Sequence, residues 1–473
     1  MNKIFSALGF IAVLASCSNT QVDIISTTQN EYWVKEEYVE IKNADSNADI
    51  IIDRTKTAQT IEGFGACFNE LGWDALSVLS IADKQVIFDE LFTPGIGANF
   101  TICRMPVAAN DFSLDWYSYN EVEGDFAMEN FSIANDRMTL VPYIQEAQKY
   151  NPDLKIWGSP WCPPSWMKYN KHYACAVSGD WLADEYQNEL KPQQQGAEGT
   201  NMFIQEDKYF KAYALYFKKY IEAYRDLDIN VSMVMPQNEW NSCQVFPSCT
   251  WTAEGLNEFV GKYLGPEMEE LGVELMLGTM ERPDASMVDT ILNDEFSGKY
   301  VKGVGFQWAG KDALPDVYKN HSDMKLYQTE QECGDGKNDW KHCNHSWDLM
   351  KHYLSHGVTS YLYWNMALKE GGVSRWGWSQ NSLVTVNKED KTYRYNYEYY
   401  LLKHVSHFVL PGAKRLITEG DFKDCLVFEN TDKSIVVVAR NSKLEARVVS
   451  IKIDNNDVVI SLRPDTFSTI VVK

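Results

Sequence analysis

Eight short runs of apolar and β-branched residues recur along the middle of this chain, and most are followed by an amphipathic stretch with helical spacing. The runs are Thr60–Phe68, Asn99–Val107, Leu154–Trp161, Val231–Trp240, Val273–Met280, Val301–Trp308, Lys325–Glu332 and Thr359–Met366. Strands that alternate with helices favour parallel pairing, and eight such units predict a closed barrel rather than an open sheet. We therefore predict the α/β class, with a (β/α)8 TIM barrel over residues 58–410.

The two ends of the chain follow a different pattern. Residues 37–53 alternate in hydropathy as strands do, and so do five runs beyond Pro411-Gly412. These runs are Asp424–Glu429, Ser434–Arg440, Ala446–Ile453, Asp457–Leu462 and Phe467–Val472. Short alternating runs separated by turns are typical of antiparallel sheets. We predict that residues 30–57 and 411–473 join in one β-sandwich packed beside the barrel.

The first residues have the pattern of an export signal. Lys3 precedes a short apolar stretch, residues 4–14, which is too short to span a bilayer. Leu14-Ala15-Ser16-Cys17 then resembles a bacterial lipobox, which implies a signal peptide over residues 1–16 and a lipid on Cys17. An ordinary secretory signal is the alternative. Residues 17–29 are predicted to be a polar tether. We expect an exported bacterial lipoprotein of the outer membrane, at its periplasmic face or at the cell surface, that meets the membrane only through this anchor.

Composition narrows the range of partners. Asp plus Glu number 66 against 44 Lys plus Arg, a net charge of −22, which is the wrong sign for a nucleic-acid-binding protein. Beyond the N-terminus there is no run of about 20 apolar residues of the kind that spans a membrane. Aromatic residues make up 13% of the chain, and their flat faces suit stacking on sugar rings.

Nine cysteines follow Cys17, an odd number, and their spacing is not that of a disulfide framework. Cys243 with Cys249, and Cys333 with Cys343, are near enough in sequence to pair in an oxidising compartment. None of the cysteines has the paired CxxC spacing of a zinc site. The sequence therefore predicts neither a metal nor a cofactor.

Two glutamates end strand-like runs on opposite sides of the predicted barrel. Glu239 lies at the end of the fourth run and Glu330 at the end of the seventh. The C-terminal ends of barrel strands meet at one mouth, where catalytic residues gather. Two carboxylates that face each other across this mouth can serve as the acid/base and the nucleophile of a retaining glycosidase. The alternative is that each is an ordinary solvated strand-end residue.

A series of motifs runs in order across nearly the whole predicted barrel. It comprises Gly63-Phe64-Gly65, Arg104-Met105-Pro106, Asp111-Phe112-Ser113, Ser159-Pro160-Trp161, Pro164-Ser165-Trp166, Gln237-Asn238-Glu239, Gln328-Thr329-Glu330 and Trp364-Asn365-Met366-Ala367-Leu368. This series resembles glycoside hydrolase family 30, the family of lysosomal glucosylceramidase and of microbial β-1,6-glucanases and xylanases. A side sandwich built from both chain ends is also that family's architecture.

The resemblance implies that Glu239 is the acid/base and Glu330 the nucleophile. Glu239 must then hold its proton near neutral pH, so we expect burial or the charge of Glu330 to raise its pKa. Asn238 is expected to bind the sugar 2-hydroxyl, a contact that tightens in the transition state. Arg104 is expected to keep Glu330 ionised and oriented, although a salt bridge without a catalytic part is the alternative.

Other residues are expected to bind the sugar. The resemblance places Asp111 in the first subsite as an acceptor for sugar hydroxyls, with Trp161 and Trp364 as its floor and wall. Plain packing is the alternative for a Trp at the barrel rim. Three further tryptophans are expected in the loops that wall the mouth, where they can stack on sugar rings. These are Trp308, Trp376 and Trp378.

Rival carboxylates are also present near the strand ends. Glu332 follows Glu330 by two positions and would point to the same strand face, so it is the alternative nucleophile if the seventh strand runs on. Glu70, Glu281 and Glu370 lie near strand or loop ends and are interpreted as loop charges.

The sugar is indicated by two stretches that differ from the glucosylceramidase pattern. They are Gly305-Phe306-Gln307-Trp308-Ala309-Gly310-Lys311 and Glu332-Cys333-Gly334-Asp335-Gly336, and they are similar to the subgroup rich in endo-β-1,6-glucanases. We therefore expect a β-glucan substrate, most of all a β-1,6-linked one. The alternatives are an exo-acting β-glucosidase, a glucosylceramidase-type enzyme or a β-xylosidase. A non-catalytic glycan-binding lipoprotein is a distant alternative, because both glutamates are present.

Overall fold

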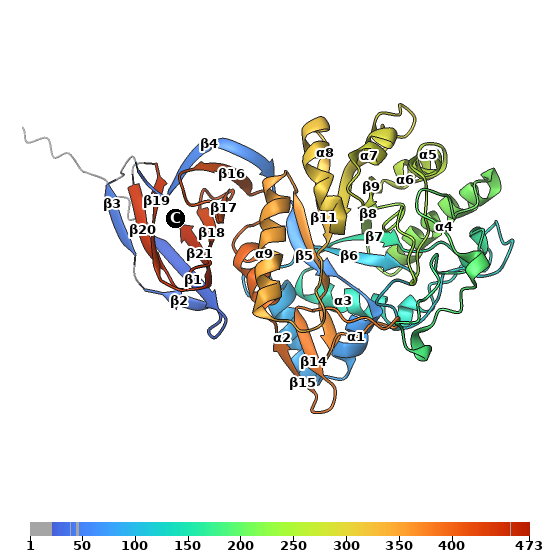
Figure 1. Ribbon diagram of the computed structural model, residues 1–473, viewed down its shortest axis with the longest axis horizontal. Helices are drawn as coiled ribbons and strands as arrows, with labels where there is room; N and C mark the ends of the chain where they lie inside the picture. The colour runs from blue at the N-terminus through green and yellow to red at the C-terminus, as the bar shows by residue number, and fades with distance from the viewer. Residues whose placement is uncertain (1–20, 38, 44–46, 455) are drawn as a thin grey trace, which may run out of the picture.

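A computed structural model of the chain describes residues 21–37, 39–43, 47–454 and 456–473. The predicted signal peptide, Cys17 and the first part of the predicted tether lie outside these residues. A barrel ringed by helices and a smaller sheet domain stand side by side (Figure 1). Within the described part of the chain, no helix combines the length and apolar character needed to cross a bilayer.

The predicted barrel is confirmed. Eight parallel strands close in the order β10-β11-β12-β5-β6-β7-β8-β9. Their bounds are β5 (Gly63–Cys67), β6 (Ile102–Val107), β7 (Lys155–Pro160), β8 (Val231–Val234), β9 (Glu274–Met280), β10 (Val301–Gln307), β11 (Lys325–Glu330) and β12 (Ser360–Asn365). Each strand lies inside one of the eight predicted runs. Nearly all strand residues are buried, as expected for parallel strands that are covered on both faces.

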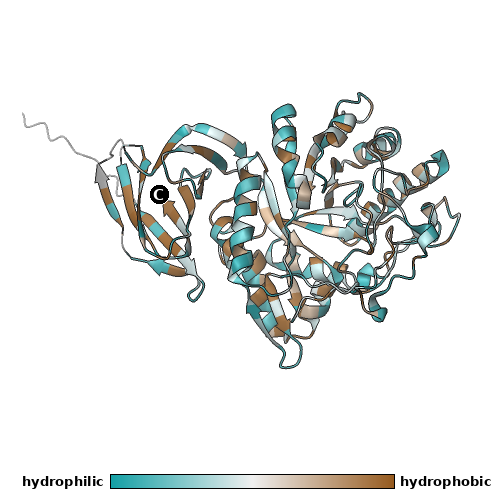
Figure 2. Cartoon of the chain, viewed as in Figure 1, coloured by the Kyte–Doolittle hydropathy of each residue, from teal (hydrophilic) through white to brown (hydrophobic). Residues whose placement is uncertain are grey.

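Ten α-helices are described, most of them in the connections between barrel strands. They are α1 (Glu70–Ser77), α2 (Ile81–Phe92), α3 (Leu140–Tyr150), α4 (Asp207–Arg225), α5 (Ala253–Phe259), α6 (Gly265–Leu271), α7 (Ala285–Leu292), α8 (Leu314–Asn320), α9 (Trp340–Ser355) and α10 (Tyr397–Ser406). The longest, α4, buries Phe210, Phe217 and Tyr224 along one face. Figure 2 shows the same division, with hydrophilic and hydrophobic residues alternating along the helices. The helices therefore pack their apolar faces on the barrel and expose their polar faces to water.

The sheet domain contains strands from both ends of the chain, as predicted. Ten strands pair in the order β2-β1-β21-β18-β17-β16-β4-β19-β20-β3. They are β1 (Val22–Thr28), β2 (Val34–Glu36), β3 (Glu40–Asn43), β4 (Ile50–Thr60), β16 (Lys414–Glu419), β17 (Cys425–Glu429), β18 (Ile435–Asn441), β19 (Arg447–Ile453), β20 (Asn456–Leu462) and β21 (Thr466–Val472). Val437 and Ile470 from one half of this sheet share a core with Ile451 and Ile460 from the other, so the two halves pack face to face.

One predicted boundary is corrected by the structure. The tether was expected to run to residue 29, yet Val22–Thr28 forms β1 and pairs with β21 along its whole length. Ile24 is buried in the sandwich core, and Ser26 Oγ lies 2.9 Å from Ser468 Oγ. Polar side chains that are satisfied inside the sandwich gave this strand the composition of a linker.

The connection after β12 contains a small sheet that the sequence did not predict. Its strands are β13 (Ala367–Lys369), β14 (Val384–Asn387) and β15 (Thr392–Tyr395). All nine cysteines of the described residues are free thiols, so neither suggested disulfide is present.

His404 of α10 joins the two domains. Its Nδ1 lies 2.8 Å from Thr469 Oγ1 in β21, and its Nε2 lies 2.9 Å from Thr27 Oγ1 in β1. The imidazole is fully buried, and burial lowers its pKa to about 3. A neutral ring therefore bridges the barrel and the sandwich.

Candidate active site

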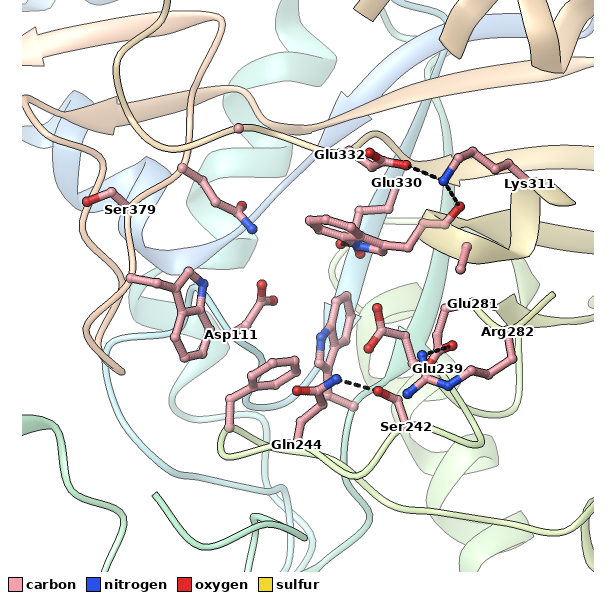
Figure 3. Close-up of a pocket in the computed structure, with 17 residues that line it drawn as sticks. Asp111, Glu239, Ser242, Gln244, Glu281, Arg282, Lys311, Glu330, Glu332 and Ser379 are labelled. Atoms are coloured by element: carbon pink, nitrogen blue, oxygen red, sulfur yellow. Dashed lines mark hydrogen bonds and ion pairs between the residues drawn. The ribbon is translucent and has the colours of Figure 1, made fainter. Parts of the chain in front are cut away.

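A cavity of about 590 Å³ opens at the C-terminal ends of the barrel strands (Figure 3). Six predicted residues line it: Asp111, Trp161, Glu239, Trp308, Glu330 and Trp378. Arg104 and Trp364 are buried in contact with lining residues, and Asn238 is buried next to Glu239 in the chain and bonded to Gln307. Trp376 differs, because its ring stacks on Trp116 with centroids 4.5 Å apart and it does not line the cavity. Of the three tryptophans predicted to wall the mouth, Trp376 therefore packs against another indole, whereas Trp308 and Trp378 line the cavity.

The backbone around Glu239 is held by both neighbouring strands. Asn238 N donates to Pro160 O at the end of β7, at 2.7 Å, and Glu239 N donates to Thr279 Oγ1 in β9, at 3.0 Å. Glu239 has a left-handed backbone with φ of 48°, which costs a non-glycine residue about 1 kcal/mol or more. Glu330 is the last residue of β11, so regular strand geometry places it.

One side chain donates to both predicted catalytic carboxylates. Gln307 Nε2 lies 3.0 Å from Glu239 Oε1 and 3.2 Å from Glu330 Oε2. Two oxygens bonded to one nitrogen lie within roughly 6 Å of each other, which is nearer to the spacing of retaining than of inverting glycosidases. Gln307 is fully buried at the end of β10, and its Oε1 accepts from Thr329 Oγ1 at 2.9 Å. Its amide is therefore oriented with the donor facing the carboxylates.

Arg104 makes the contact with Glu330 that the sequence predicted. Its Nη1 lies 2.9 Å from Glu330 Oε2, and its Nη2 lies 2.6 Å from Asn238 Oδ1. Ser159 Oγ accepts from Nη2 at 2.9 Å, and the guanidinium lies 4.3 Å from the Trp161 ring centroid. This buried cation is committed to Glu330 and Asn238, and Glu239 does not share it.

Trp308 has a second role besides lining the cavity. Its Nε1 donates to Glu330 Oε1 at 3.1 Å, so both oxygens of Glu330 accept hydrogen bonds. The residue has a left-handed backbone with φ of 46° and begins the turn after β10. Lys311 Nζ donates to the Trp308 carbonyl at 3.2 Å and pairs with Glu332 at 2.9 Å, which ties this turn to the segment after β11.

Burial and nearby charge separate the two carboxylates chemically. Burial raises the pKa of Glu239 well above its usual range, and the charges of Glu281 and Glu330 raise it further. Burial also raises the pKa of Glu330, but the charge of Arg104 and hydrogen bonds from Trp308, Arg104 and Gln307 act against this rise. The first proton that the pair takes up therefore resides on Glu239.

The closed end of the cavity combines a carboxyl group with an indole face. Asp111 is 5% exposed, and burial followed by the charge of Glu330 raises its pKa well above the usual range. Trp161 lines the same cavity and stacks on Trp364 with centroids 5.2 Å apart. At the open side, the Trp378 ring lies 5.1 Å from Phe246.

The rival carboxylates have partners of their own. Glu332 pairs with Lys311 at 2.9 Å and with His345 at 3.1 Å. Burial acts to raise the pKa of Glu332, yet these hydrogen bonds bring it below its ordinary value. Glu370 pairs with Arg394 away from the cavity.

Two residues beside the predicted catalytic pair were not among the predicted site residues. They are Gln307 and Glu281, and the interpretation of Glu281 as a loop charge is wrong because it is 3% exposed and lines the cavity. Gln307 occurs in a quoted motif but carries no charge, so no acid/base pattern singled it out. Glu281 follows β9 directly, and only its place at a strand end could have separated it from the exposed loop charges. Across the described residues, no cluster of three or more His, Cys, Asp or Glu side chains has an arrangement suited to a metal ion.

Comparison with known proteins gives two family matches. The model of the glycosyl hydrolase family 30 TIM-barrel domain matches residues 61–409. A prokaryotic membrane lipoprotein lipid attachment site matches residues 1–18, which agrees with the predicted exported lipoprotein.

Relatives with both expected names occur among curated proteins. The endo-1,6-beta-D-glucanase neg1 of Aspergillus fumigatus is 27% identical over 403 residues, which cover 80% of this chain and 77% of the relative. The lysosomal acid glucosylceramidase of Mus musculus is 25% identical over 421 residues, which cover 82% of this chain and 76% of the relative.

Solved structures share the fold over nearly the whole chain. The structure of SrfJ from Salmonella typhimurium has a TM-score of 0.82 at 22% identity and covers 95% of this chain and 99% of its own. That of the endo-β1,6-glucanase BT3312 has a TM-score of 0.78 at 22% identity, with the same coverage. Since the family model spans the barrel from its first strand to the helix after its last, the chain is a glycoside hydrolase and belongs to glycosyl hydrolase family 30.

Proposed function

We propose that this enzyme hydrolyses β-glucosidic bonds with retention of configuration, and that its substrate is a β-1,6-linked glucan cut within the chain. The observation that carries the retaining mechanism is the Gln307 amide, which hydrogen-bonds Glu239 and Glu330 at once. The two carboxylates are thereby close enough for one to attack the anomeric carbon while the other reaches the leaving oxygen.

The reaction takes two displacements. Glu330 attacks the anomeric carbon as the bond to the leaving oxygen breaks, and Glu239 gives its proton to that oxygen. The sugar is then held as an ester of Glu330. Glu239, now a carboxylate, takes a proton from water while the water oxygen attacks the same carbon and releases Glu330. Two inversions return the β configuration.

The surrounding residues have roles that follow from their contacts. Asn238 Oδ1 accepts from Arg104, Gln307 and Thr279, so the orientation of its amide is fixed and its Nδ2 can donate to the 2-hydroxyl of the bound sugar. Asp111 and Trp161 bind the hydroxyls and the face of the same ring.

The open side of the cavity favours a leaving group rich in hydroxyls. Besides the five carboxyl groups Asp111, Glu239, Glu281, Glu330 and Glu332, the polar and charged residues that line the cavity are Ser242, Gln244, Arg282, Lys311, Ser379 and Gln380 (Figure 3). A sugar can hydrogen-bond such a wall, whereas the chains of a lipid would bury these groups without partners. Five lining carboxyl groups against two cations also disfavour acidic sugars. The names of two relatives, both endo-1,6-beta-D-glucanases, agree with this preference, although five other relatives are named glucosylceramidases or putative glucosylceramidases.

A substrate panel tests the proposal. The enzyme is incubated with β-1,6-, β-1,3- and β-1,4-glucans, glucosylceramide and an aryl β-glucoside at matched sugar concentration, and early products are identified by chromatography and proton NMR. Short β-configured oligosaccharides from β-1,6-glucan are expected, with the other glucans nearly untouched. Faster cleavage of glucosylceramide or of the aryl glucoside supports the exo-acting alternative, and an initial α product excludes the retaining mechanism.

The same export pattern suggests the location. We propose that the lipid on Cys17 holds the enzyme in the outer membrane, at its periplasmic face or at the cell surface. The matched lipid attachment site supports the anchor.

A further inference from the structure

A third carboxyl group is buried beside the proposed acid/base. Glu281 follows β9 directly and lines the same cavity as Glu239, and the two side chains lie next to each other (Figure 3). Glu281 is 3% exposed. Its Oε2 pairs with Arg282 Nη1 at 2.6 Å, whereas Oε1 is buried without a hydrogen-bond partner among the described residues. The ion pair with Arg282 therefore satisfies only Oε2. The negative charge on Oε1 is not offset by a hydrogen bond, and it acts on the neighbouring buried groups.

The charges around Glu239 are not balanced. Glu281 and Arg282 face it from the end of β9, Glu330 from β11 and Asp111 from the segment after β6. Arg104, the nearest buried cation on the other side, is bonded to Glu330 and Asn238.

The remaining cation, Arg282, is shared. It pairs with Glu281 and also with Glu198, whose side chain is 47% exposed. Gln307 is the side chain that hydrogen-bonds Glu239 itself, and it is neutral. Glu239 thus lies in a low-dielectric site with carboxylates nearby and no cation of its own.

We propose that Glu281 is a positioning residue for catalysis, whose charge keeps the proton on Glu239 until the leaving oxygen takes it. This rests on the proposed role of Glu239 as acid/base. After burial, the charge of Glu281 is the largest cause that raises the pKa of Glu239, ahead of that of Glu330. Burial raises the pKa of Glu281 itself to about 7, and the charge of Arg282 opposes the rise.

The two neighbouring carboxylates act at different times in the cycle. Glu330 loses its charge when it becomes an ester, so its effect on Glu239 disappears for the second step. Glu281 is never bonded to the sugar, so wherever it is ionised, at and above the pH of about 7 at which it titrates, its charge persists through both steps. The charge of Glu330 therefore raises the proton affinity of Glu239 only in the first step. The charge of Glu281 also raises it in the second step, and it keeps Glu239 basic enough to deprotonate water.

The test is the pH dependence of kcat/KM on two substrates in four proteins: wild type, Glu281→Gln, Glu281→Asp and Glu198→Gln. Loss of activity at high pH reports loss of the proton from Glu239. With a disaccharide, whose leaving group needs that proton, Glu281→Gln should move the alkaline limb down by about one pH unit. Glu281→Asp keeps the charge but moves it one methylene farther from Glu239. It should shift the alkaline limb in the same direction as Glu281→Gln, by a smaller amount. Glu198→Gln removes an equal charge from the exposed side of Arg282 and should leave the limb in place.

The second substrate separates an electrostatic from a structural effect. A dinitrophenyl β-glucoside leaves without protonation, so its alkaline limb should not follow the Glu281 substitutions. An alkaline limb that stays in place for the disaccharide in both Glu281 variants overturns the proposal, as does an equal shift for both substrates. If Glu281→Gln does not fold, the smaller shift in Glu281→Asp decides. Glu239→Ala is measured alongside: if it cleaves the disaccharide as wild type does, the proposed acid/base role itself fails.

Discussion

Arg104 Nη1 lies 2.9 Å from Glu330 Oε2, and the exposed fractions of the two side chains are 0% and 4%. A buried ion pair of this kind keeps one carboxylate ionised in a cavity where burial favours the neutral acid. Glu239, which has no such partner, retains its proton. The proposed roles of the two glutamates, Glu330 as nucleophile and Glu239 as acid/base, therefore depend on where the Arg104 guanidinium is placed.

Removal of the nucleophile should abolish turnover. Glu330→Gln preserves the shape but cannot form the ester, and we expect kcat on every substrate to fall by about four powers of ten or more. Glu332→Gln is the matched control, because Glu332 lines the same cavity and is paired with Lys311. It should retain most activity. Inactivation by Glu332→Gln with survival of Glu330→Gln would reverse the assignment.

Removal of the acid/base should depend on the leaving group. Glu239→Ala should lose about 10²- to 10⁴-fold on a disaccharide and far less on a dinitrophenyl glucoside, whose leaving group needs no proton. Azide needs no general base, so it should restore turnover of the activated substrate and yield a β-glycosyl azide. NMR of that adduct checks the outcome, and an α-azide would contradict the two-step mechanism.

Loss of the shared donor should shift the whole pH profile. Hydrogen bonds from Gln307 lower the pKa of both Glu239 and Glu330. In Gln307→Leu both pKa values should therefore rise. The acidic limb, which needs ionised Glu330, and the alkaline limb, which needs protonated Glu239, should both move to higher pH by roughly one unit or less. Movement of one limb alone would show that Gln307 serves only one carboxylate.

The closed end of the cavity should matter more for binding than the rim. Asp111→Ala removes a buried hydroxyl acceptor and should cost about 2–4 kcal/mol in kcat/KM, whereas Trp378→Ala at the open side should cost about 1 kcal/mol. Steady-state kinetics on a β-1,6-linked oligosaccharide measures both. A larger loss in Trp378→Ala would place the dominant contact on the leaving-group side.

Acid should weaken the junction of the two domains. In the unfolded chain His404 takes up a proton near pH 6.5, but in the folded protein only near pH 3, because it is buried between Thr27 and Thr469. The stability that this residue contributes is therefore complete above pH 6.5 and is lost as pH falls towards 3. Between pH 7 and 4.5, the free energy of unfolding of the wild type should fall by about 2 kcal/mol more than that of His404→Gln.

Urea unfolding at several pH values measures the difference. Parallel curves for wild type and His404→Gln would show that His404 is free to take up a proton in the folded protein.

The barrel could be predicted because its strands are buried on both faces. Strands β6 and β12 are mostly apolar and fully buried, and the polar residues in them include Arg104 and Asn365. The run around the fourth strand was predicted too long, since β8 ends at Val234 and the chain becomes irregular before Glu239. A left-handed backbone at Glu239 leaves no trace in hydropathy.

The rest of the site depends on tertiary contacts. Gln307 is one of many amides in the sequence, and only the closure of β10 beside β11 brings it to both glutamates. In the sequence, Glu281 cannot be distinguished from a glutamate in an exposed loop. Only the structure shows that it is buried. Strand β1 was missed for the opposite reason, because its polar residues find partners inside the sandwich.

The start of β1 at Val22 limits the distance between the folded enzyme and a membrane that holds its lipid anchor. In a chain lipidated at Cys17, residues 18–21 alone separate the anchor from Val22, where β1 begins. A fully extended chain from Cys17 to Val22 spans at most roughly 18 Å. The sandwich, which contains β1, then lies close to the lipid headgroups. The barrel lies beside the sandwich and is joined to the anchor only through it (Figure 1). An enzyme held this way reaches only substrate close to the membrane, so its glycan substrate must come to the membrane surface before it is hydrolysed.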